Sequence, residues 1–236
     1  MAIGPLGVGF TTQGIEQVQA RARRAGVSFL SPPIELTPEP EGASGPRRFE
    51  VFGQTRDSEF VVLIERQNVD TAYGNISDAW HTSEPLHTSH VVRDLTAASR
   101  FMCTALDHEV IFREECVGSE FEQLMSVPAN TRFRFEMLRH PDHSIGRIIF
   151  IEYETMQTRP NGSVTADARP VAPRARGLVA LRYDCSDLEA AVSRARLQGG
   201  TVARPITEVD SELLGTGRVA TLESPVGLLI ELWEPH

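Results

Sequence analysis

A repeated order of one strand, one helix and three strands is the feature that most constrains how this chain can fold. Residues 7–13 are typical of a short strand, and Gly14 to Ala25 form an amphipathic helix pattern. A further strand and a hairpin follow, and the same order returns near the C-terminus. Such self-similarity indicates a fold built from copies of one unit. Aligning the two copies matches the following pairs: Gly14 with Asp187, Arg21-Ala22-Arg23 with Arg194-Ala195-Arg196, Gly26 with Gly199, Pro32 with Pro205 and, after a drift of the alignment, Glu65 with Glu231.

The middle of the chain contains a third copy. A strand over 87–92 leads into a helix over 94–106, and three strands follow. We therefore expect three βαβββ modules separated by two linkers, the second of which is rich in Pro, Ala and Arg. The predicted boundaries are 1–66 for the first module, 67–86 for a linker, 87–157 for the second module, 158–176 for a linker and 177–236 for the third module.

Composition limits the possible environments and partners of the chain. The formal net charge of −9 argues against a general nucleic-acid-binding role. No apolar run approaches the roughly 20 residues that a membrane-spanning helix needs, and the N-terminus is a poor match to a signal peptide. The cysteines are few and irregularly spaced, which indicates reduced thiols and a cytoplasmic protein. They are Cys103, Cys116 and Cys185.

The three-module pattern and several residues within it resemble the vicinal oxygen chelate superfamily. This superfamily includes glyoxalase, methylmalonyl-CoA epimerase, extradiol dioxygenases, and fosfomycin and bleomycin resistance proteins. The resemblance covers nearly the whole chain. It rests on His87, Asp94-Leu95, Ser99, Phe101 and Leu106 in the middle copy, and on Asp187-Leu188, Gly199-Gly200 and Ser224-Pro225-Val226-Gly227-Leu228-Leu229-Ile230-Glu231-Leu232 in the last copy.

The resemblance implies an α+β fold in which paired modules form a cupped mixed sheet flanked by helices. It also implies metal ligands on the first and last strands of each paired module. We expect the second and third modules to pair, which gives His87, Glu152 and Glu231 as ligands and leaves Ala180 at the fourth position. The first module has Gly7 and Glu65 at the matching positions and offers at most one ligand.

One imidazole and two carboxylates suit a divalent ion such as Zn, Ni, Co, Mn, Fe or Mg, with water or substrate at the open positions. The ion would act as a Lewis acid on a substrate with adjacent oxygens. Glu152 or Glu231 would also serve as the catalytic base if it loosened from the metal. Strand alternation points Arg182 the same way as Ala180, so it is a candidate to bind an anionic group of the substrate.

Structural explanations compete with these functional ones. The two glutamates lie in apolar strands, and they could instead face solvent at the rim of a sheet. His90 has the opposite parity to His87 and is expected on the face of the sheet that packs against a helix. His140 and His143 flank a proline in a hairpin and are expected to be solvated.

Three functions stay open. The first is a metal-dependent lyase, isomerase or epimerase of glyoxalase type, favoured by the predicted ligand set. The second is a metal-free protein that binds or sequesters a small molecule, as bleomycin resistance proteins do, and Ala180 and Gly7 favour it. The third is a scaffold subunit. An extradiol dioxygenase is less favoured, because the resemblance would place its second histidine at Ala180.

Three modules cannot all pair within one chain. Three alternatives are open for the first module. It pairs with its copy in a second chain, giving a homodimer, which we slightly favour. Otherwise it lacks a partner module that relatives possess, or it packs edge-on. A small-molecule ligand is the expected partner, without nucleic acid or membrane.

Overall fold

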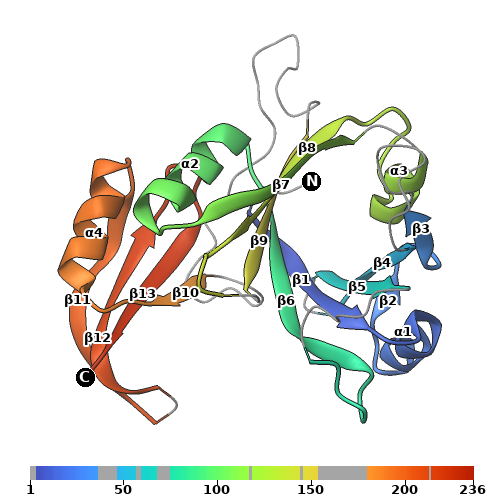
Figure 1. The fold of residues 1–236 in the computed structure, drawn as a ribbon, viewed down its shortest axis with the longest axis horizontal. Coiled ribbons are helices and arrows are strands. Elements are labelled where there is room, and N and C mark those ends of the chain that lie inside the picture. The colour runs from blue at the N-terminus through green and yellow to red at the C-terminus, as the bar shows by residue number, and fades with distance from the viewer. Residues whose placement is uncertain are drawn as a thin grey trace.

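Two strands, β1 (Gly4–Thr12) and β6 (Thr82–Val91), join the first and second modules into one sheet. They pair antiparallel in the computed structural model, with Val8 opposite Thr88 and Gly9 opposite His87. The sheet has nine strands in the order β2-β4-β5-β1-β6-β9-β8-β7, with β3 attached to β4 (Figure 1). It curves into a cup whose two walls come from different modules.

The structure describes residues 4–36, 47–56, 60–67, 75–116, 119–143, 146–153, 180–212 and 214–236. The helices are α1 (Ile15–Arg24), α2 (Leu95–Ala105), α3 (Ser119–Met125) and α4 (Leu188–Leu197). The remaining strands are β2 (Ser28–Phe29), β3 (Ile34–Leu36), β4 (Arg48–Gln54), β5 (Phe60–Arg66), β7 (Glu109–Cys116), β8 (Phe133–Arg139), β9 (Arg147–Tyr153), β10 (Leu181–Asp184), β11 (Thr201–Ser211), β12 (Gly215–Glu223) and β13 (Leu229–Pro235).

All three modules arrange their strands in the same way. In each of them the first strand lies beside the fourth, the fourth beside the third and the third beside the second: β1-β5-β4-β2, β6-β9-β8-β7 and β10-β13-β12-β11. The first and fourth strands are parallel in every module, and the later pairs are antiparallel. The predicted α+β fold of three βαβββ modules with a cupped mixed sheet is therefore confirmed.

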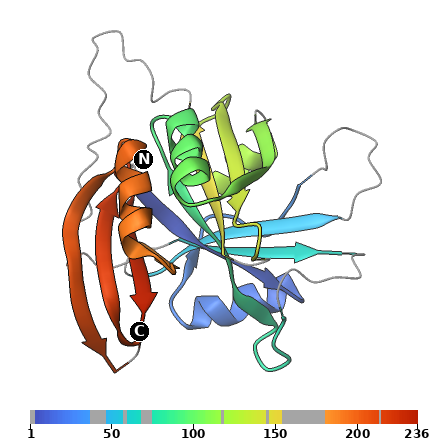
Figure 2. The same cartoon turned by 60° about the vertical axis from the view of Figure 1, so that its left-hand side comes forward.

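The partner of the second module differs from our expectation. We expected the second and third modules to share a sheet, but the first module takes that place through the β1–β6 pairing. The third module forms its own four-stranded sheet, which lies beside the cup (Figure 2). Sequence similarity identifies the modules, but pairing depends on which strand edges meet, and the repeat pattern carries no information about that choice.

The third module is held to the second through their helices. Helices α2 and α4 lie side by side (Figure 1), and one buried cluster includes residues from both helices and from the sheets behind them. Phe101 and Met102 of α2 are each 1% exposed, and Leu188 and Ala195 of α4 are completely buried. Burial of these apolar side chains is the main force that holds the two modules together.

Aspartates start two of the helices. The side chain of Asp94 accepts a hydrogen bond from the Ala97 backbone N–H at 2.8 Å, and Asp187 does the same for Ala190 at 2.9 Å. Both therefore satisfy an N–H group that the helix itself leaves unpaired.

Several local features differ from the sequence predictions. Helix α3 and strand β3 were not predicted, and β6 begins at Thr82, inside the expected linker over 67–86. Strand β11 continues through Arg204-Pro205 with shifts of register, as an edge strand can. The predicted linker over 158–176 lies outside the described residues.

The structure also bears on two of the composition-based expectations. The described residues contain no helix that is long and apolar enough to span a membrane. The three cysteines form no disulfide with one another, in agreement with the predicted reduced thiols.

Two leucines of α4 provide a matched test of the helix packing. Leu188 is completely buried in the shared cluster, whereas Leu197 on the same helix is 83% exposed. We expect Leu188→Ala to lower the free energy of unfolding by about 2–5 kcal/mol, because it leaves a cavity. Leu197→Ala should change it by less than about 0.5 kcal/mol. Urea unfolding followed by circular dichroism measures both, and equal losses would contradict this packing.

Candidate functional site

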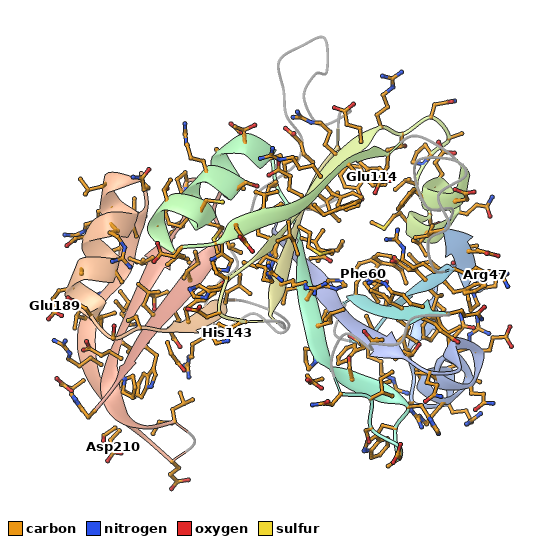
Figure 3. All side chains as sticks on the ribbon, viewed as in Figure 1. Arg47, Phe60, Glu114, His143, Glu189 and Asp210 are labelled. Carbon is orange, nitrogen blue, oxygen red and sulfur yellow. The ribbon has the colours of Figure 1, made fainter. Side chains whose placement is uncertain are left out.

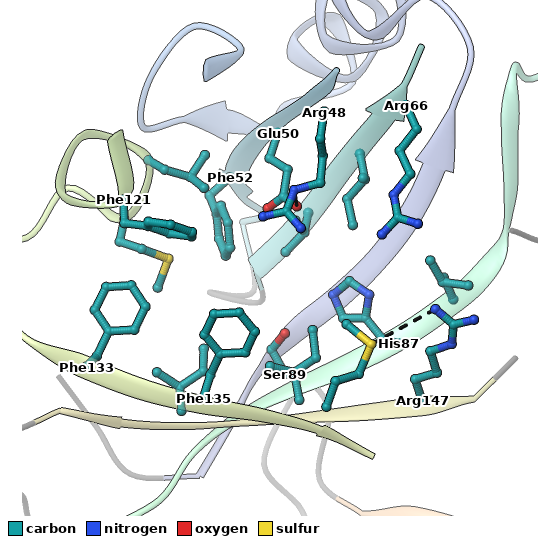
Figure 4. Close-up of a pocket in the computed structure, with 18 residues that line it drawn as sticks. Arg48, Glu50, Phe52, Arg66, His87, Ser89, Phe121, Phe133, Phe135 and Arg147 are labelled. Atoms are coloured by element: carbon teal, nitrogen blue, oxygen red, sulfur yellow. Dashed lines mark hydrogen bonds and ion pairs between the residues drawn. The ribbon is translucent and has the colours of Figure 1, made fainter. Parts of the chain in front are cut away.

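A pocket lies inside the cup, between β4 and β5 of the first module and β6, β8 and β9 of the second, with α3 at one end (Figure 4). It holds about 740 Å³ of empty space, part of it open to solvent. Its lining combines charged, aromatic and aliphatic side chains: Arg48, Glu50, Phe52, Val62, Ile64, Arg66, Leu86, His87, Ser89, Phe121, Leu124, Met125, Phe133, Phe135, Met137, Arg147, Ile149 and Ile151.

Strand pairing gathers the charged groups at one side of this pocket. In the β4–β5 pair Arg48 lies directly opposite Arg66, and in the β6–β9 pair His87 lies directly opposite Arg147. Figure 4 shows Arg66 and Arg147 near His87, and Arg48 beside Glu50. Like charges directly opposite each other on neighbouring strands are destabilising. Glu50 offsets part of the repulsion between Arg48 and Arg66, and a bound anion would offset more of it.

A glycine on the neighbouring strand makes room for the imidazole of His87. A Cβ atom added at Gly9 would come within 2.0 Å of the His87 ring carbon Cε1 and 2.3 Å of Nε2. The ring therefore lies directly against the β1 backbone, and any side chain at position 9 would push it away. The side chain of His87 is almost fully buried as a result, with 4% of the residue exposed.

Burial and neighbouring arginines keep His87 neutral. The pKa of His87 falls from 6.5 to about 4, first because burial disfavours the charged ring and then because of the positive charges of Arg147 and Arg66. Glu50 is the one carboxylate among the described lining residues, and burial raises its pKa while Arg48 and Arg66 oppose that rise. Arg48 and Glu50 form an ion pair at 3.2 Å.

The opposite side of the pocket is apolar. Phe121, Phe133 and Phe135 lie near the end covered by α3, and Phe52 lies between Phe121 and Arg48 (Figure 4). They belong to a buried cluster that extends over both modules of the cup. Figure 3 shows Phe60, which packs against the same cluster, on the inside of the cup. The pocket is thus divided into a basic side and an aromatic side.

The structure does not bring the predicted metal ligands together. Glu152 shares a face of the sheet with Phe150, which packs against α2, whereas His87 shares the opposite face with Ile149. Glu152 is 3% exposed and accepts a hydrogen bond from Arg134. Strand alternation therefore places these two side chains on opposite faces of the sheet.

Glu231 lies farther from this group, in the separate sheet of the third module. There it accepts a hydrogen bond at 2.6 Å from Nε of Arg182, the residue predicted to bind substrate. Arg182 also lies over the Trp233 ring at 5.9 Å. Neither Glu231 nor Arg182 lines the pocket in the cup.

Sheet register shows which glutamates of the three modules are equivalent. Thr11, Val91 and Asp184 each lie three residues before the N-cap of a helix, and they pair with Ile64, Ile151 and Trp233. The next residues along the fourth strands are therefore the equivalent ones, and they are Glu65, Glu152 and Glu234. Glu231 lies three positions earlier, so its alignment with Glu65 was wrong.

Two of these equivalent glutamates serve the helices. Glu65 accepts a hydrogen bond at 2.7 Å from the Ile15 backbone N–H, and Glu234 accepts one at 3.2 Å from Leu188 N–H. Ile15 and Leu188 are the first residues of α1 and α4. A carboxylate at this end of a helix accepts hydrogen bonds from N–H groups that have no partner within the helix, and it interacts favourably with the positive end of the helix dipole. The repeated glutamate thus has a structural explanation.

The cup carries apolar residues where the third module carries Glu231. Glu231 pairs with Arg182, which lies five residues before the N-cap of α4. In the first and second modules the residues five before the N-cap are Gly9 and Ser89, and they pair with Val62 and Ile149. Both Val62 and Ile149 line the pocket. Of the predicted ligands, only His87 therefore reaches the cup.

The side chains that line the cup do not fit a divalent ion. Among the described residues, no three His, Cys, Asp or Glu side chains lie close enough to hold one. In addition, His87 is surrounded by guanidinium groups, which would repel a cation. The residues of the cup favour an anion instead.

The other histidines behave differently from one another. His90 is on the helix-packed face as predicted, with its ring 6.0 Å from that of Phe150 and Nε2 within 2.9 Å of the Thr88 hydroxyl. His140 and His143 were expected to be solvated; His143 is exposed, but His140 is only half-exposed and packs edge-on against the buried ring of His108 at 5.9 Å.

Sequence reasoning missed most of the pocket. Arg48, Arg66 and Arg147 were not singled out, because each stands at the end of an apolar strand, where an arginine is usually solvated. Gly9 was also missed. One signal was present: Arg66 and Arg147 have the same strand parity as the apolar residues that face the cup, Val62 and Ile64 in β5 and Ile149 and Ile151 in β9. That signal becomes readable only when the two modules are known to pair.

Comparison with known proteins supports the fold. A family model described as Glyoxalase/Bleomycin resistance protein/Dioxygenase superfamily matches residues 85–232, more than half of the chain. The chain belongs to this superfamily. The matched region covers nearly all of the second and third modules, which carry the sequence motif, and omits the first module, which forms half of the cup.

Solved structures of the superfamily share the architecture. Glyoxalase I from Zea mays is 13% identical with a TM-score of 0.59, and its V278E mutant is 14% identical with a TM-score of 0.63. Both alignments cover 98% of this chain and 67% of the maize chain. A glyoxalase family protein from Bacillus cereus is 21% identical with a TM-score of 0.52, over 62% of this chain and 89% of that one. No curated protein matches the sequence.

The buried histidines make stability depend on pH. The pKa values of His87 and His90 fall from 6.5 to about 4 and about 3, so the unfolded chain binds more protons below pH 6.5. The free energy of unfolding should therefore decrease as pH is lowered from about 7 to about 5.5. Urea unfolding at several pH values measures this slope. His90→Phe should make the slope shallower, and an unchanged slope would contradict the assignment.

Proposed function

We propose that the cup between the first and second modules binds a small molecule without the help of a divalent metal ion. The observation that supports this proposal most directly is the pocket itself, which carries charged groups at one side, apolar groups at the other and one imidazole in between. Concave, mostly apolar pockets with a few convergent polar groups are typical ligand sites. A metal-free binding or sequestering role was the second of our sequence hypotheses.

Metal-dependent lyase, isomerase or epimerase chemistry has less support. It needs His87, Glu152 and Glu231 around one ion, and these residues lie on two faces of one sheet and in a second sheet. The same separation weighs against extradiol dioxygenase chemistry. We therefore assign no catalytic step to Glu152 or Glu231 and propose no resident metal.

Formation of a homo-oligomer stays a prediction. The first module, which we expected to pair with another chain, pairs within its own chain. Among the described residues, β10 pairs with β13 alone, so it lies at an edge of the third module's sheet. A second copy at this edge is the form of oligomer that the fold suggests, and light scattering measures it.

Blocking the pocket tests the proposed function. Ile149 lines the pocket and is half-buried, so Ile149→Trp should fill the cavity at the centre of the cup. We expect the wild-type protein, kept in a chelator, to bind the neutral fluorescent probe N-phenylnaphthylamine, and the variant to bind it at least about tenfold more weakly. Titration of probe fluorescence measures both affinities.

Leu197→Trp is the matched control, because Leu197 is 83% exposed on α4, away from the cup. It should bind the probe as the wild type does, and circular dichroism should show that both variants are folded. Equal probe binding by wild type and Ile149→Trp would contradict a site in the cup. Binding that appears only after addition of a divalent metal would contradict the metal-free proposal.

A further inference from the structure

We propose that the ligand of the cup is an organic acid, with one small oxyanion group among Arg48, Arg66 and Arg147 and an apolar body against the phenylalanines under α3. This inference rests on the proposed function and names the class of ligand that the pocket selects. It follows from the composition of the pocket's two sides and from the strand pairs that create them.

The balance of charge at the basic side favours an anion. The described lining residues contain three guanidinium groups and one carboxylate, and the imidazole of His87 is neutral. Burial also raises the pKa of Glu50, which makes its negative charge harder to maintain. Because Arg48 and Arg66 are directly opposite on neighbouring strands, their mutual repulsion decreases when an oxyanion lies between them.

The low polarity of the surroundings strengthens this selection. Arg147 is 7% exposed, and its guanidinium lies beside the Met137 sulfur at 4.0 Å rather than in bulk water. Charges attract more strongly where water is excluded. A guanidinium also presents a planar set of donors that matches a carboxylate or phosphate group. Arg147 is therefore well placed to recognise an oxyanion rather than any polar group.

His87 adds a neutral hydrogen-bonding group at the same place. A neutral imidazole carries one N–H donor and one acceptor nitrogen, so it can donate to an oxyanion without adding charge. Its position is held by close contact with the β1 backbone at Gly9 and by strand pairing opposite Arg147. The donors of the basic side thus come from both modules, and the site exists only because the modules pair.

The aromatic side determines the rest of the ligand. Phe121 and Met125 of α3 close the pocket above Phe133 and Phe135 of β8. Burial of apolar surface there favours a hydrocarbon chain or ring. A small, fully polar acid would leave this side unfilled, and a neutral hydrocarbon would form no charge-assisted hydrogen bond with the arginines. The pocket therefore fits a molecule that has both parts.

Four ligands of equal chain length separate these requirements. We expect decanoate or decyl phosphate to bind to the chelator-treated full chain at least about tenfold more tightly than decanamide, because a charged hydrogen bond contributes more than a neutral one. Decylamine should bind more weakly than decanamide. Displacement of N-phenylnaphthylamine measures all four affinities below the concentrations at which these amphiphiles form micelles. Equal affinities, or preference for the amine, would overturn the inference.

Two arginine substitutions locate the effect. Arg147→Met keeps a long side chain but removes the charge, and it should weaken binding of the better anion at least about tenfold while changing decanamide affinity by less than about twofold. Arg113→Met is the control, because the side chain of Arg113 is 70% exposed and pairs with Glu136 outside the pocket. An equal loss for the anion and the amide in Arg147→Met would mean that the arginine only shapes the pocket, and this also overturns the inference.

Failure of this inference is distinguishable from failure of the proposed function. If N-phenylnaphthylamine binds and Ile149→Trp abolishes its binding, the cup is a ligand site whatever the anions do. If the anions then show no advantage, only the assignment of ligand class fails. If the probe and all four ligands fail to bind, the proposed function fails as well.

Discussion

The antiparallel pairing of β1 with β6 is the interaction on which the rest of the structure depends. It places the glycine-containing first strand of one module beside the histidine-containing first strand of the next, with Gly9 opposite His87. Because each first strand is also paired with the fourth strand of its own module, this single ladder fixes the positions of both walls of the cup. The pocket is therefore a property of the module pair, and neither module contains it alone.

The three modules show how one folding unit can meet different partners. The first and second modules meet edge to edge and share a sheet, whereas the second and third meet helix to helix and share a buried cluster. These two contacts use different surfaces of the second module, so it takes part in both. A glutamate on the fourth strand supports the helix in the outer two modules, through Glu65 and Glu234. The unit is thus stabilised internally in the same way although its neighbours differ.

The sequence predicted the modules well and the site poorly, for physical reasons. Local signals such as the helix period and the repeated order of strands and helices depend on neighbouring residues, and they are readable in a single chain. The site depends on which strands meet, and no local signal reports that. Glu231 was therefore assigned to a cup in which Val62 and Ile149 hold its positions, and the arginines opposite each other across strand pairs were overlooked.

A crystal structure of the protein with decanoate carrying a terminal bromine, grown in a chelator, tests the central claim most directly. The claim predicts an anomalous bromine peak among the phenylalanines beneath α3, and a carboxylate within hydrogen-bond distance of Arg66 or Arg147. This orientation would show that the cup selects an acid by charge at one side and by apolar burial at the other. A bromine peak outside the cup, or one beside the arginines with the carboxylate at the aromatic side, would contradict it.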